Sequence, residues 1–325
     1  MADWKELPLG IDLGSTRARI ALAECDRNEN VRIRAIVARD LPDGAATPLC
    51  VMEPDLVSAV IEDMVSELGS RERRCVLALG APACALRVIA FPKMTWAERM
   101  RAARFEAQRF SGWTLDTEET VVRVHAVDPT SGEFAVGVTR RQAIETRVES
   151  VKKAGLRVVA VDHEAFALRR LFPQCDAIVD VAAERSGIHI FGEHGPLSLA
   201  IELGGAAITQ GIAAELSIDL PSAERRKRIL GCAGAGLGPR TELIEAIASV
   251  VERARARGPI ERIALTGNGS RIPTFARELE EAVGSVTEMP VPELLRTGVY
   301  PEDVVRAASP DWVLAASLAV WALAA

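Results

Sequence analysis

The residues best suited to bind a charged ligand lie near the start of the chain, in the segment Gly10-Ile-Asp-Leu-Gly-Ser-Thr-Arg-Ala-Arg19. Asp12 ends a short apolar run, where its carboxylate could hold a hydrated magnesium ion, because hard cations prefer oxygen ligands. Gly14 permits a tight turn whose backbone N–H groups point at phosphate oxygens, and Ser15 and Thr16 add hydroxyl donors. The five residues from Asp12 to Thr16 are equally typical of a plain hairpin turn.

A second informative segment is Leu265-Thr-Gly-Asn-Gly-Ser-Arg-Ile-Pro-Thr-Phe. A strand that ends in Gly-x-Gly brings backbone close to a flat ligand, and the helix expected over 273–283 offers its N-terminus. The glycine-rich stretch 231–238 follows a basic helical segment rather than a strand, which favours a loop over a dinucleotide-binding turn. The sequence has no Gly-x-x-x-x-Gly-Lys-Ser/Thr segment, so a P-loop enzyme is not supported.

The elements that must position these segments occur twice in the same order. Hydrophobic periodicity predicts three strands, a helix and a strand in the first part of the chain, and a similar series returns about 165 residues later. The predicted elements are strands 9–13, 18–23, 31–37 and 75–79 with helix 55–68, then strands 175–181, 187–191, 197–201 and 260–266 with helices at about 208–216 and 241–257. The order predicts an α/β fold with two similar domains.

A different series of elements separates the two halves. We expect a helix over 95–110 with Thr95 as N-cap and Glu98 as its capping partner, two strands over 120–127 and 133–139, a helix over 141–154 and a strand over 156–161. Together they predict an inserted subdomain from about residue 88 to 161.

Composition excludes several classes of protein. The chain has 325 residues, 49% of them hydrophobic, and a net charge of −6, which suits two globular domains and gives no basic field for nucleic acid. The start lacks a signal peptide, and the longest apolar run, 312–325, is shorter than the ~20 residues that cross a bilayer. We expect a buried terminal helix there and no direct membrane insertion. Six cysteines without a CxxC pair indicate reduced thiols and a cytoplasmic protein.

The order and spacing of these segments resemble the actin-like superfamily, and within it the PilM family of type IV pilus assembly proteins, over almost the whole chain. The resemblance implies two ribonuclease-H-like domains, 1–165 and 166–309, with the inserted subdomain in the first and a helix at about 310–325 packed back on it. The segments on which the resemblance rests are 10–16, Phe91-Pro-Lys-Met, Glu106-Ala-Gln-Arg, 159–168, 178–181, 202–209, 223–227, 265–269 and the tail from Ala315.

The resemblance also implies that the cleft binds ATP with magnesium. Asp12, Gly14, Ser15 and Thr16 match the first phosphate loop, with Arg19 where a lysine is usual, and Asp12 would hold magnesium through water. Asp180 opens the second phosphate loop, and Gly204 and Gly205 match a loop near the phosphates. Glu224 and Lys227 match the segment that meets the ribose and adenine. The adenosine loop is matched by Gly267, Asn268 and Gly269.

The second phosphate loop departs from the family pattern. Asp-Ile-Gly-x-x-x-Thr is replaced by Asp180-Val-Ala-Ala-Glu-Arg-Ser186. Ala182 adds a β-carbon where backbone should approach phosphate, and Glu184 adds a negative charge that magnesium or Arg185 would have to offset. Two hypotheses follow: nucleotide binding with weak or absent hydrolysis, or a pseudo-ATPase that has lost its ligand.

The function implied is a cytoplasmic scaffold at the inner face of the inner membrane, in a type IV pilus or type II-like secretion platform. Such a scaffold docks the N-terminal tail of a PilN-like membrane protein between the first domain and the inserted subdomain; self-association stays open. One alternative is a small-molecule kinase of the same superfamily, although no sugar-site signature Gly-x-x-x-Asp stands out. Another is an FtsA-like filament-forming protein, although the chain shows neither the linker nor the basic amphipathic helix expected near its end.

Overall fold

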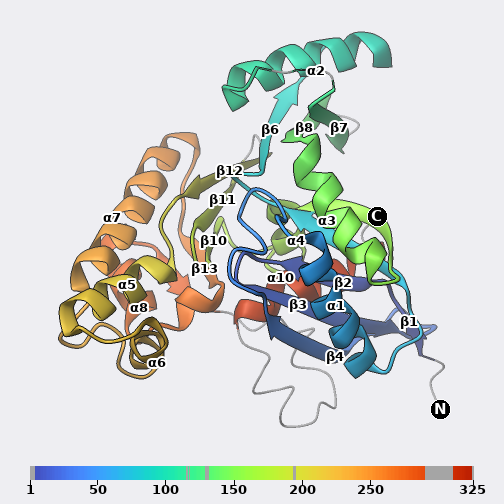
Figure 1. Ribbon diagram of the computed structural model, residues 1–325. Helices are drawn as coiled ribbons and strands as arrows, with labels where there is room; N and C mark the ends of the chain where they lie inside the picture. Colours follow the sequence, from blue (N-terminus) through green and yellow to red (C-terminus); the bar gives the residue numbers. More distant parts are fainter. Residues whose placement is uncertain are drawn as a thin grey trace.

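The computed structural model describes residues 4–114, 116, 118–128, 132–192, 195–289 and 310–323. Figure 1 shows two α/β halves side by side, with a smaller three-stranded sheet and its helix above them. The two halves and the insertion confirm the α/β, actin-like fold expected from the sequence.

The first half is built on a six-stranded mixed sheet. Its order is β4-β3-β2-β5-β9, with β2, β5 and β9 mutually parallel and the short β1 paired to the end of β3. Helices α1 and α3 pack together against one face, where they bury an apolar core. The elements are β1 (Lys5–Glu6), β2 (Leu9–Leu13), β3 (Arg17–Cys25), β4 (Val31–Asp40), α1 (Pro54–Leu68), β5 (Arg74–Leu79), α3 (Arg141–Lys153) and β9 (Arg157–His163).

The opposite face of this sheet is covered by a helix from the far end of the chain. Helix α10 (Val313–Ala319), preceded by the 3-10 turn η4 (Pro310–Trp312) and followed by η5 (Trp321–Leu323), packs on β2, β3 and the linking helix α4 (Glu164–Leu171). The approach is closest at Gly10, where a β-carbon would lie 2.1 Å from the carbonyl oxygen of Ala315. Gly10 therefore serves helix packing rather than the phosphate turn.

The second half repeats the strand order of the first. Its five-stranded sheet runs β12-β11-β10-β13-β14, with β10, β13 and β14 parallel and β11 and β12 antiparallel. Its helices bury a large apolar cluster. The elements are β10 (Ala177–Val181), β11 (Ser186–Gly192), β12 (Gly195–Ile201), α5 (Gly205–Leu216), α6 (Leu220–Leu230), α7 (Leu237–Ala254), η1 (Arg255–Arg257), β13 (Arg262–Thr266), η2 (Asn268–Arg271), α8 (Phe275–Val283) and β14 (Val286–Glu288).

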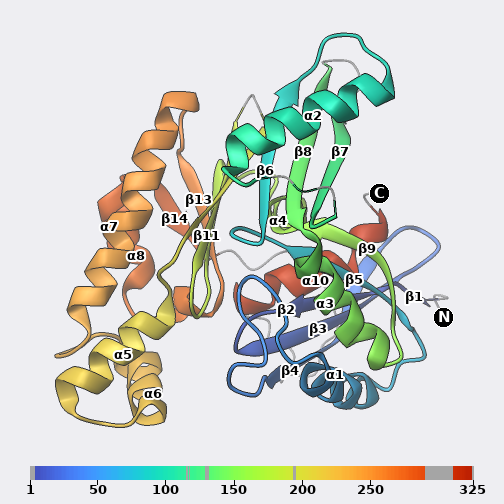
Figure 2. The same ribbon diagram turned by 45° about the horizontal axis from the view of Figure 1, so that its top comes forward.

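The inserted part forms a separate three-stranded antiparallel sheet, in the order β6-β8-β7. Helix α2 covers one face and carries the predicted capping box, in which the Glu98 amide donates to Thr95 Oγ1 and the Thr95 amide to Glu98 Oε2. On the other side β6 packs beside β12 of the second half (Figure 1), and Figure 2 shows the insertion from a second direction. The elements are β6 (Cys84–Ala90), α2 (Trp96–Ser111), β7 (Thr120–Asp128) and β8 (Glu133–Arg140).

The end of this insertion differs from the expectation. The sequence pattern predicts an insertion that continues to about residue 161, whereas β9 pairs with β5 in the first sheet and α3 packs on α1. The physical reason is apolar burial: Val151 and Leu156 join the core of the first half. Helix and strand periodicity locates such elements but does not say which sheet they join. The division of the whole chain into domains stays a proposal.

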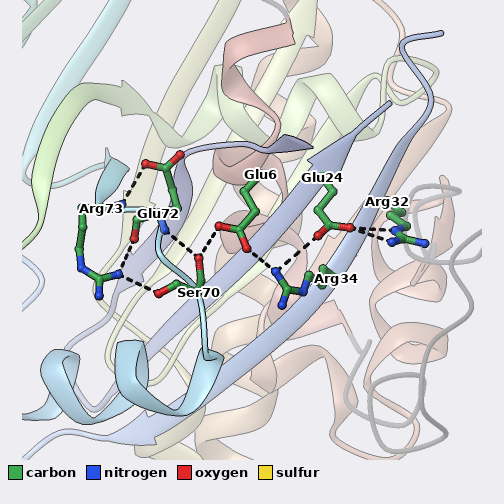
Figure 3. Close-up of polar contacts among 7 residues, drawn as sticks. All are labelled: Glu6, Glu24, Arg32, Arg34, Ser70, Glu72 and Arg73. Atoms are coloured by element: carbon green, nitrogen blue, oxygen red, sulfur yellow. Dashed lines mark hydrogen bonds and ion pairs between the residues drawn. The ribbon is translucent and has the colours of Figure 1, made fainter. Parts of the chain in front are cut away.

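A network of polar contacts ties the short β1 to the rest of the first sheet (Figure 3). The Ser70 hydroxyl, just beyond α1, donates to Glu6 Oε2 at 2.7 Å, and Glu6 also pairs with Arg34 of β4. Glu24 of β3, whose side chain is 8% exposed, pairs with Arg32 at 2.8 Å and with Arg34 at 3.5 Å. Because the contacts are shared among several charges, the network holds β1 more firmly than isolated surface pairs would.

Gly10→Ala is expected to destabilise the protein. The new β-carbon would meet backbone atoms of α10, which cannot move without lifting the helix, so the free energy of unfolding should fall by about 1–3 kcal/mol or more. Chemical denaturation would measure the change. Gly238→Ala in α7 is the matched control, because its β-carbon meets nothing within 4 Å. Equal stability of the two variants would contradict the tight packing of α10 on β2.

Candidate functional site

Two hairpins with the same geometry, one from each half, carry the expected phosphate-loop residues. In the first, Asp12 pairs with Arg19 in the β2–β3 ladder and the Gly14 amide donates to the Arg17 carbonyl at 3.1 Å. In the second, Asp180 pairs with Gly187 in the β10–β11 ladder and the amide of residue 182 donates to the carbonyl of residue 185 at 3.0 Å. The hairpins are therefore equivalent residue by residue.

The first hairpin places Asp12 beside Arg19, as its spacing allows. Arg19 Nη1 donates to Asp12 Oδ2 at 3.2 Å, and its Nε lies 3.5 Å from Oδ2 of Asp311, just before α10. The guanidinium is therefore held between two carboxylates. Ser15 and Thr16 form the tip of the hairpin, and their hydroxyls make no hydrogen bond to another described residue. These two hydroxyls are available for a ligand.

In the second half, Asp180 is held by the segment expected to bind adenosine. Thr266 Oγ1 donates to Asp180 Oδ1 at 3.0 Å. Gly267 has φ +80°, and a β-carbon on it would lie 2.5 Å from the carbonyl oxygen of Val181; one on Gly269 would lie 2.3 Å from Val181 Cγ1. Both glycines are thus required by packing against β10. Asn268 lies between them at the start of η2 and is partly exposed.

Gly204 and Gly205 pack directly on the second hairpin. The amides of Gly205 and Ala206, at the start of α5, donate to the carbonyls of Ala182 and Ala183 at 2.9 and 2.8 Å. A β-carbon on Gly204 would lie 2.5 Å from the Ala183 carbonyl oxygen. The helix begins at Gly205, earlier than expected from the sequence, because these tertiary bonds satisfy its first amides.

Glu224 and Lys227 lie together between α5 and α6. Lys227 Nζ contacts the Gly205 carbonyl at 2.8 Å, Thr209 Oγ1 at 2.7 Å and Glu224 Oε2 at 2.6 Å, which uses all three ammonium hydrogens. Burial lowers the pKa of Lys227, while Glu224 opposes that shift. Thr209 also belongs to this group, although the sequence marks it only as part of the segment 202–209 that carries the family resemblance. In this arrangement Lys227 supports Gly205 and the second hairpin.

Where the two hairpins meet, four charged side chains influence one another: Asp12, Glu164, Asp180 and Arg185, here called the junction cluster. Burial raises the pKa of Asp12 to about 6; Asp180 and Glu164 add to the rise, and Arg19 and Arg185 oppose it. Burial also raises the pKa of Asp180, with Glu164 adding to the effect. For Glu164, burial alone would raise the pKa, but Arg185 and two imidazoles bring it below its ordinary value.

Glu164 and Arg185 form the central contact of the junction cluster. Arg185 Nη2 donates to Glu164 Oε1 at 2.8 Å, and the two side chains are 14% and 10% exposed. A β-carbon on Gly80 would overlap Glu164 Oε2, so this carboxylate fits only against glycine. Glu184, in contrast, is exposed at the tip of the second hairpin, and its effect on a phosphate stays a prediction. The sequence does not predict that Glu164 pairs with Arg185, because this contact appears only when α4 packs beside the second hairpin.

Two buried histidines complete the surroundings. The rings of His163 and His189 lie 6.2 Å apart, and His189 Nδ1 bonds to Ser198 Oγ at 2.9 Å. Burial lowers the pKa of both, that of His189 to about 3, while Glu164 opposes the shift. His189 is fully buried inside β11, within the strand that the sequence predicts over 187–191.

Comparison with protein families identifies the chain. The family described as type IV pilus assembly protein PilM matches residues 10–322. The chain belongs to the PilM family. A solved structure of a PilM–PilN type IV pilus biogenesis complex aligns with 26% identity and a TM-score of 0.84, covering 96% of this chain and 97% of that one. The match over nearly the whole chain confirms the family that the sequence resembles.

More distant solved structures share the fold. The ethanolamine utilization protein EutJ from Carboxydothermus hydrogenoformans aligns at 15% identity with a TM-score of 0.63, covering 98% of this chain and 90% of that one. An activator of 2-hydroxyisocaproyl-CoA dehydratase from Clostridium difficile, with bound ADPNP, aligns at 13% identity with a TM-score of 0.50, covering 98% and 94%. A comparison with curated proteins finds no match. None of the helices in the described residues is long and apolar enough to cross a membrane.

The buried His189 predicts a specific pH dependence of stability. Its folded pKa of about 3 lies below the ordinary value of 6.5, so the unfolded state binds more protons between these values and stability is lost as the pH falls below about 6.5. His189→Gln should remove on the order of 3 kcal/mol of this loss between pH 7 and 4. Urea denaturation across that range measures both slopes. Parallel slopes for wild type and variant would show that His189 does not titrate on unfolding.

Proposed function

We propose that this PilM-family chain is a cytoplasmic scaffold of a type IV pilus or related inner-membrane platform, which binds ATP with magnesium between its two hairpins and docks a PilN-like membrane protein. The observation that carries the nucleotide part is the equivalence of the hairpins at Asp12 and Asp180, one from each half, which lie close enough for the charge of Asp180 to raise the pKa of Asp12. The scaffold part rests on the family and on the similarity to a PilM solved with PilN.

The residues present fit a nucleotide in part. Ser15 and Thr16 offer unpaired hydroxyls at the first hairpin, and Asp12 can hold magnesium through water. Among the described residues no group of three or more His, Cys, Asp or Glu side chains is arranged to hold a metal, so magnesium would arrive with the nucleotide. Gly267, Asn268 and Gly269 would border the adenosine, as the family pattern implies.

The fit is less favourable at two places. The first amides of α5 are already bonded to Ala182 and Ala183, so this helix start does not offer them to phosphate. The three hydrogens of Lys227 are taken by protein acceptors, so its contact with ribose or adenine would require it to leave one of them. Both points favour binding with weak or absent hydrolysis. In that case ATP, with its magnesium, acts as a structural ligand that joins the two halves.

Addition of ATP with magnesium is expected to raise the melting temperature, because a ligand of the folded state stabilises that state. The free energy of unfolding should rise by about 2.7 kcal/mol when the ATP concentration is 100 times Kd. Asp12→Asn should abolish the dependence of this shift on magnesium, measured against ATP with EDTA. Asp63→Asn, the same change on an exposed position of α1, is the control. A wild-type protein that shows no shift with millimolar ATP and magnesium would refute nucleotide binding.

The partner site is proposed at the side of the first half that adjoins the insertion. Strands β9 and β7 end their sheets in the described part of the chain, and a free strand edge can accept an extended peptide by β-sheet addition. Val161 of β9 is 37% exposed and offers an apolar contact on such an edge. The occupant would be the N-terminal tail of the PilN-like protein, which would bring the scaffold to the inner membrane.

Val161→Glu is expected to weaken binding of a synthetic PilN-like N-terminal peptide by about tenfold or more, because it places a charge in an apolar contact. Fluorescence anisotropy with labelled peptide measures Kd. Val286→Glu is the matched control, since Val286 is also exposed, at 49%, on β14, which ends the other large sheet. If both variants bound peptide as tightly as wild type, the site would lie away from β9.

A further inference from the structure

Arginines occupy equivalent positions in the two hairpins but point in different directions. Arg17, in the first, extends outward to Asp40 with 3.4 Å between Nε and Oδ1, and these side chains are 33% and 83% exposed. Arg185, in the second, extends inward to Glu164 and is 14% exposed. Since the hairpin backbones match, the inward direction follows from the buried carboxylate of Glu164 and not from the turn.

The buried guanidinium of Arg185 has an unused side. Its Nη2 donates to Glu164 Oε1, whereas its Nη1 is buried without a hydrogen-bond partner in the described part of the chain. Glu164 Oε2 and Nε2 of both neighbouring histidines are likewise buried without partners. A buried donor without a partner costs about 1–3 kcal/mol, so this concentration indicates that a polar group completes the site.

Space beside Nη1 is kept by a glycine. A β-carbon on Gly187 would lie 3.5 Å from Arg185 Nη1 and 3.2 Å from His189 Nε2. Any side chain at position 187 would therefore fill the region that these donors border. Gly187 is the ladder partner of Asp180, so the space adjoins the second hairpin and faces the junction cluster.

The carboxylates where the hairpins meet require a nearby cation such as Arg185 if a phosphate chain is to bind there. Asp12, Asp180 and Glu164 are three carboxylates at the meeting of the hairpins, and Arg19 is already held between Asp12 and Asp311. Arg185 is the cation of the junction cluster; the charge of Arg147 also acts on Glu164 and Asp12, but its Nη1 and Nη2 already donate to backbone carbonyls. Without it a phosphate chain would meet uncompensated negative charge, which magnesium alone would have to offset.

We propose that Arg185 is the phosphate-binding residue of the second hairpin: Nη2 stays on Glu164 and Nη1 binds a terminal phosphate oxygen of the nucleotide. The side chain thus replaces backbone contacts that Ala182 and the occupied start of α5 no longer provide. A guanidinium suits this role because its donors form a rigid fork that can hold carboxylate and phosphate together. This assignment rests on the proposed binding of ATP and names Arg185 as one residue that contacts the phosphate.

The test must avoid a buried, unpaired Glu164, because removing Arg185 alone leaves that charge without its partner and endangers folding. Glu164→Gln is therefore the reference, and Glu164→Gln/Arg185→Gln is compared with it. Isothermal titration with ATP and magnesium should give a Kd about 10- to 100-fold weaker for the double variant, the usual effect of one charge-assisted hydrogen bond. Adenosine, titrated in parallel, should bind both proteins equally.

Arg277→Gln in the wild-type background is the charge control, since Arg277 lies on α8 with its side chain 71% exposed; its Kd for ATP should equal that of the wild type. Equal ATP affinity of Glu164→Gln and the double variant would overturn the role of Arg185 and leave ATP binding intact. An equal loss for adenosine would show a general collapse of the site and also overturn it. A wild-type protein that binds no ATP would refute the proposed nucleotide function and this assignment with it.

Discussion

Charged groups held out of water where the two halves meet constrain most of the structure. Removing an ion from water costs several kcal/mol unless a partner or hydrogen bonds compensate, so each buried carboxylate needs a fixed companion. Asp12 has Arg19, Glu164 has Arg185, and Asp180 has the Thr266 hydroxyl. The Asp12–Arg19 pair is internal to the first hairpin, and the Asp180–Thr266 bond joins two strands of the second sheet. The Glu164–Arg185 pair alone of the three links the start of α4 to the second hairpin, so it connects the helix that follows the first sheet to the second half.

The residues proposed to bind the nucleotide differ in how much they also contribute to the stability of the fold. The Thr16 carbonyl accepts the Leu41 amide, but the hydroxyls of Ser15 and Thr16 make no hydrogen bond to another described residue, so they can be given to a ligand. Gly267 and Gly269 are required by close packing on Val181, and Lys227 holds the start of α5. Substitutions at these last three positions would disturb the second half before they report on binding. Loss of binding on mutation is therefore informative at the hairpin tips, and in the junction cluster only when a charge and its buried partner are replaced together.

Much of the fold could be predicted because it follows from local patterns. Strand and helix periodicity located β2, β3 and α1, and a four-residue signal located the capping box at Thr95. The side on which α3 and β9 pack could not be read, since periodicity marks an apolar face but not the sheet that buries it. The first hairpin position was predicted from Asp12 and the Gly14-Ser-Thr turn, whereas the second followed from the family resemblance, because Ala182 stands where the family has glycine. The pairing of Glu164 with Arg185 depends on tertiary placement of residues 21 apart, which no local pattern encodes.

The contact of α10 with β2 has a consequence for how the chain acquires its structure. The strand that begins the first sheet is covered on one face by a helix encoded some 300 positions later, with Gly10 against Ala315. Until that helix has been synthesised, the apolar face of β2 and β3 has no cover, and contacts of such long sequence separation form slowly. A nascent chain would therefore carry an exposed apolar sheet face through most of translation. Such a surface is one that chaperones hold, and the first half can mature only after the second has been made.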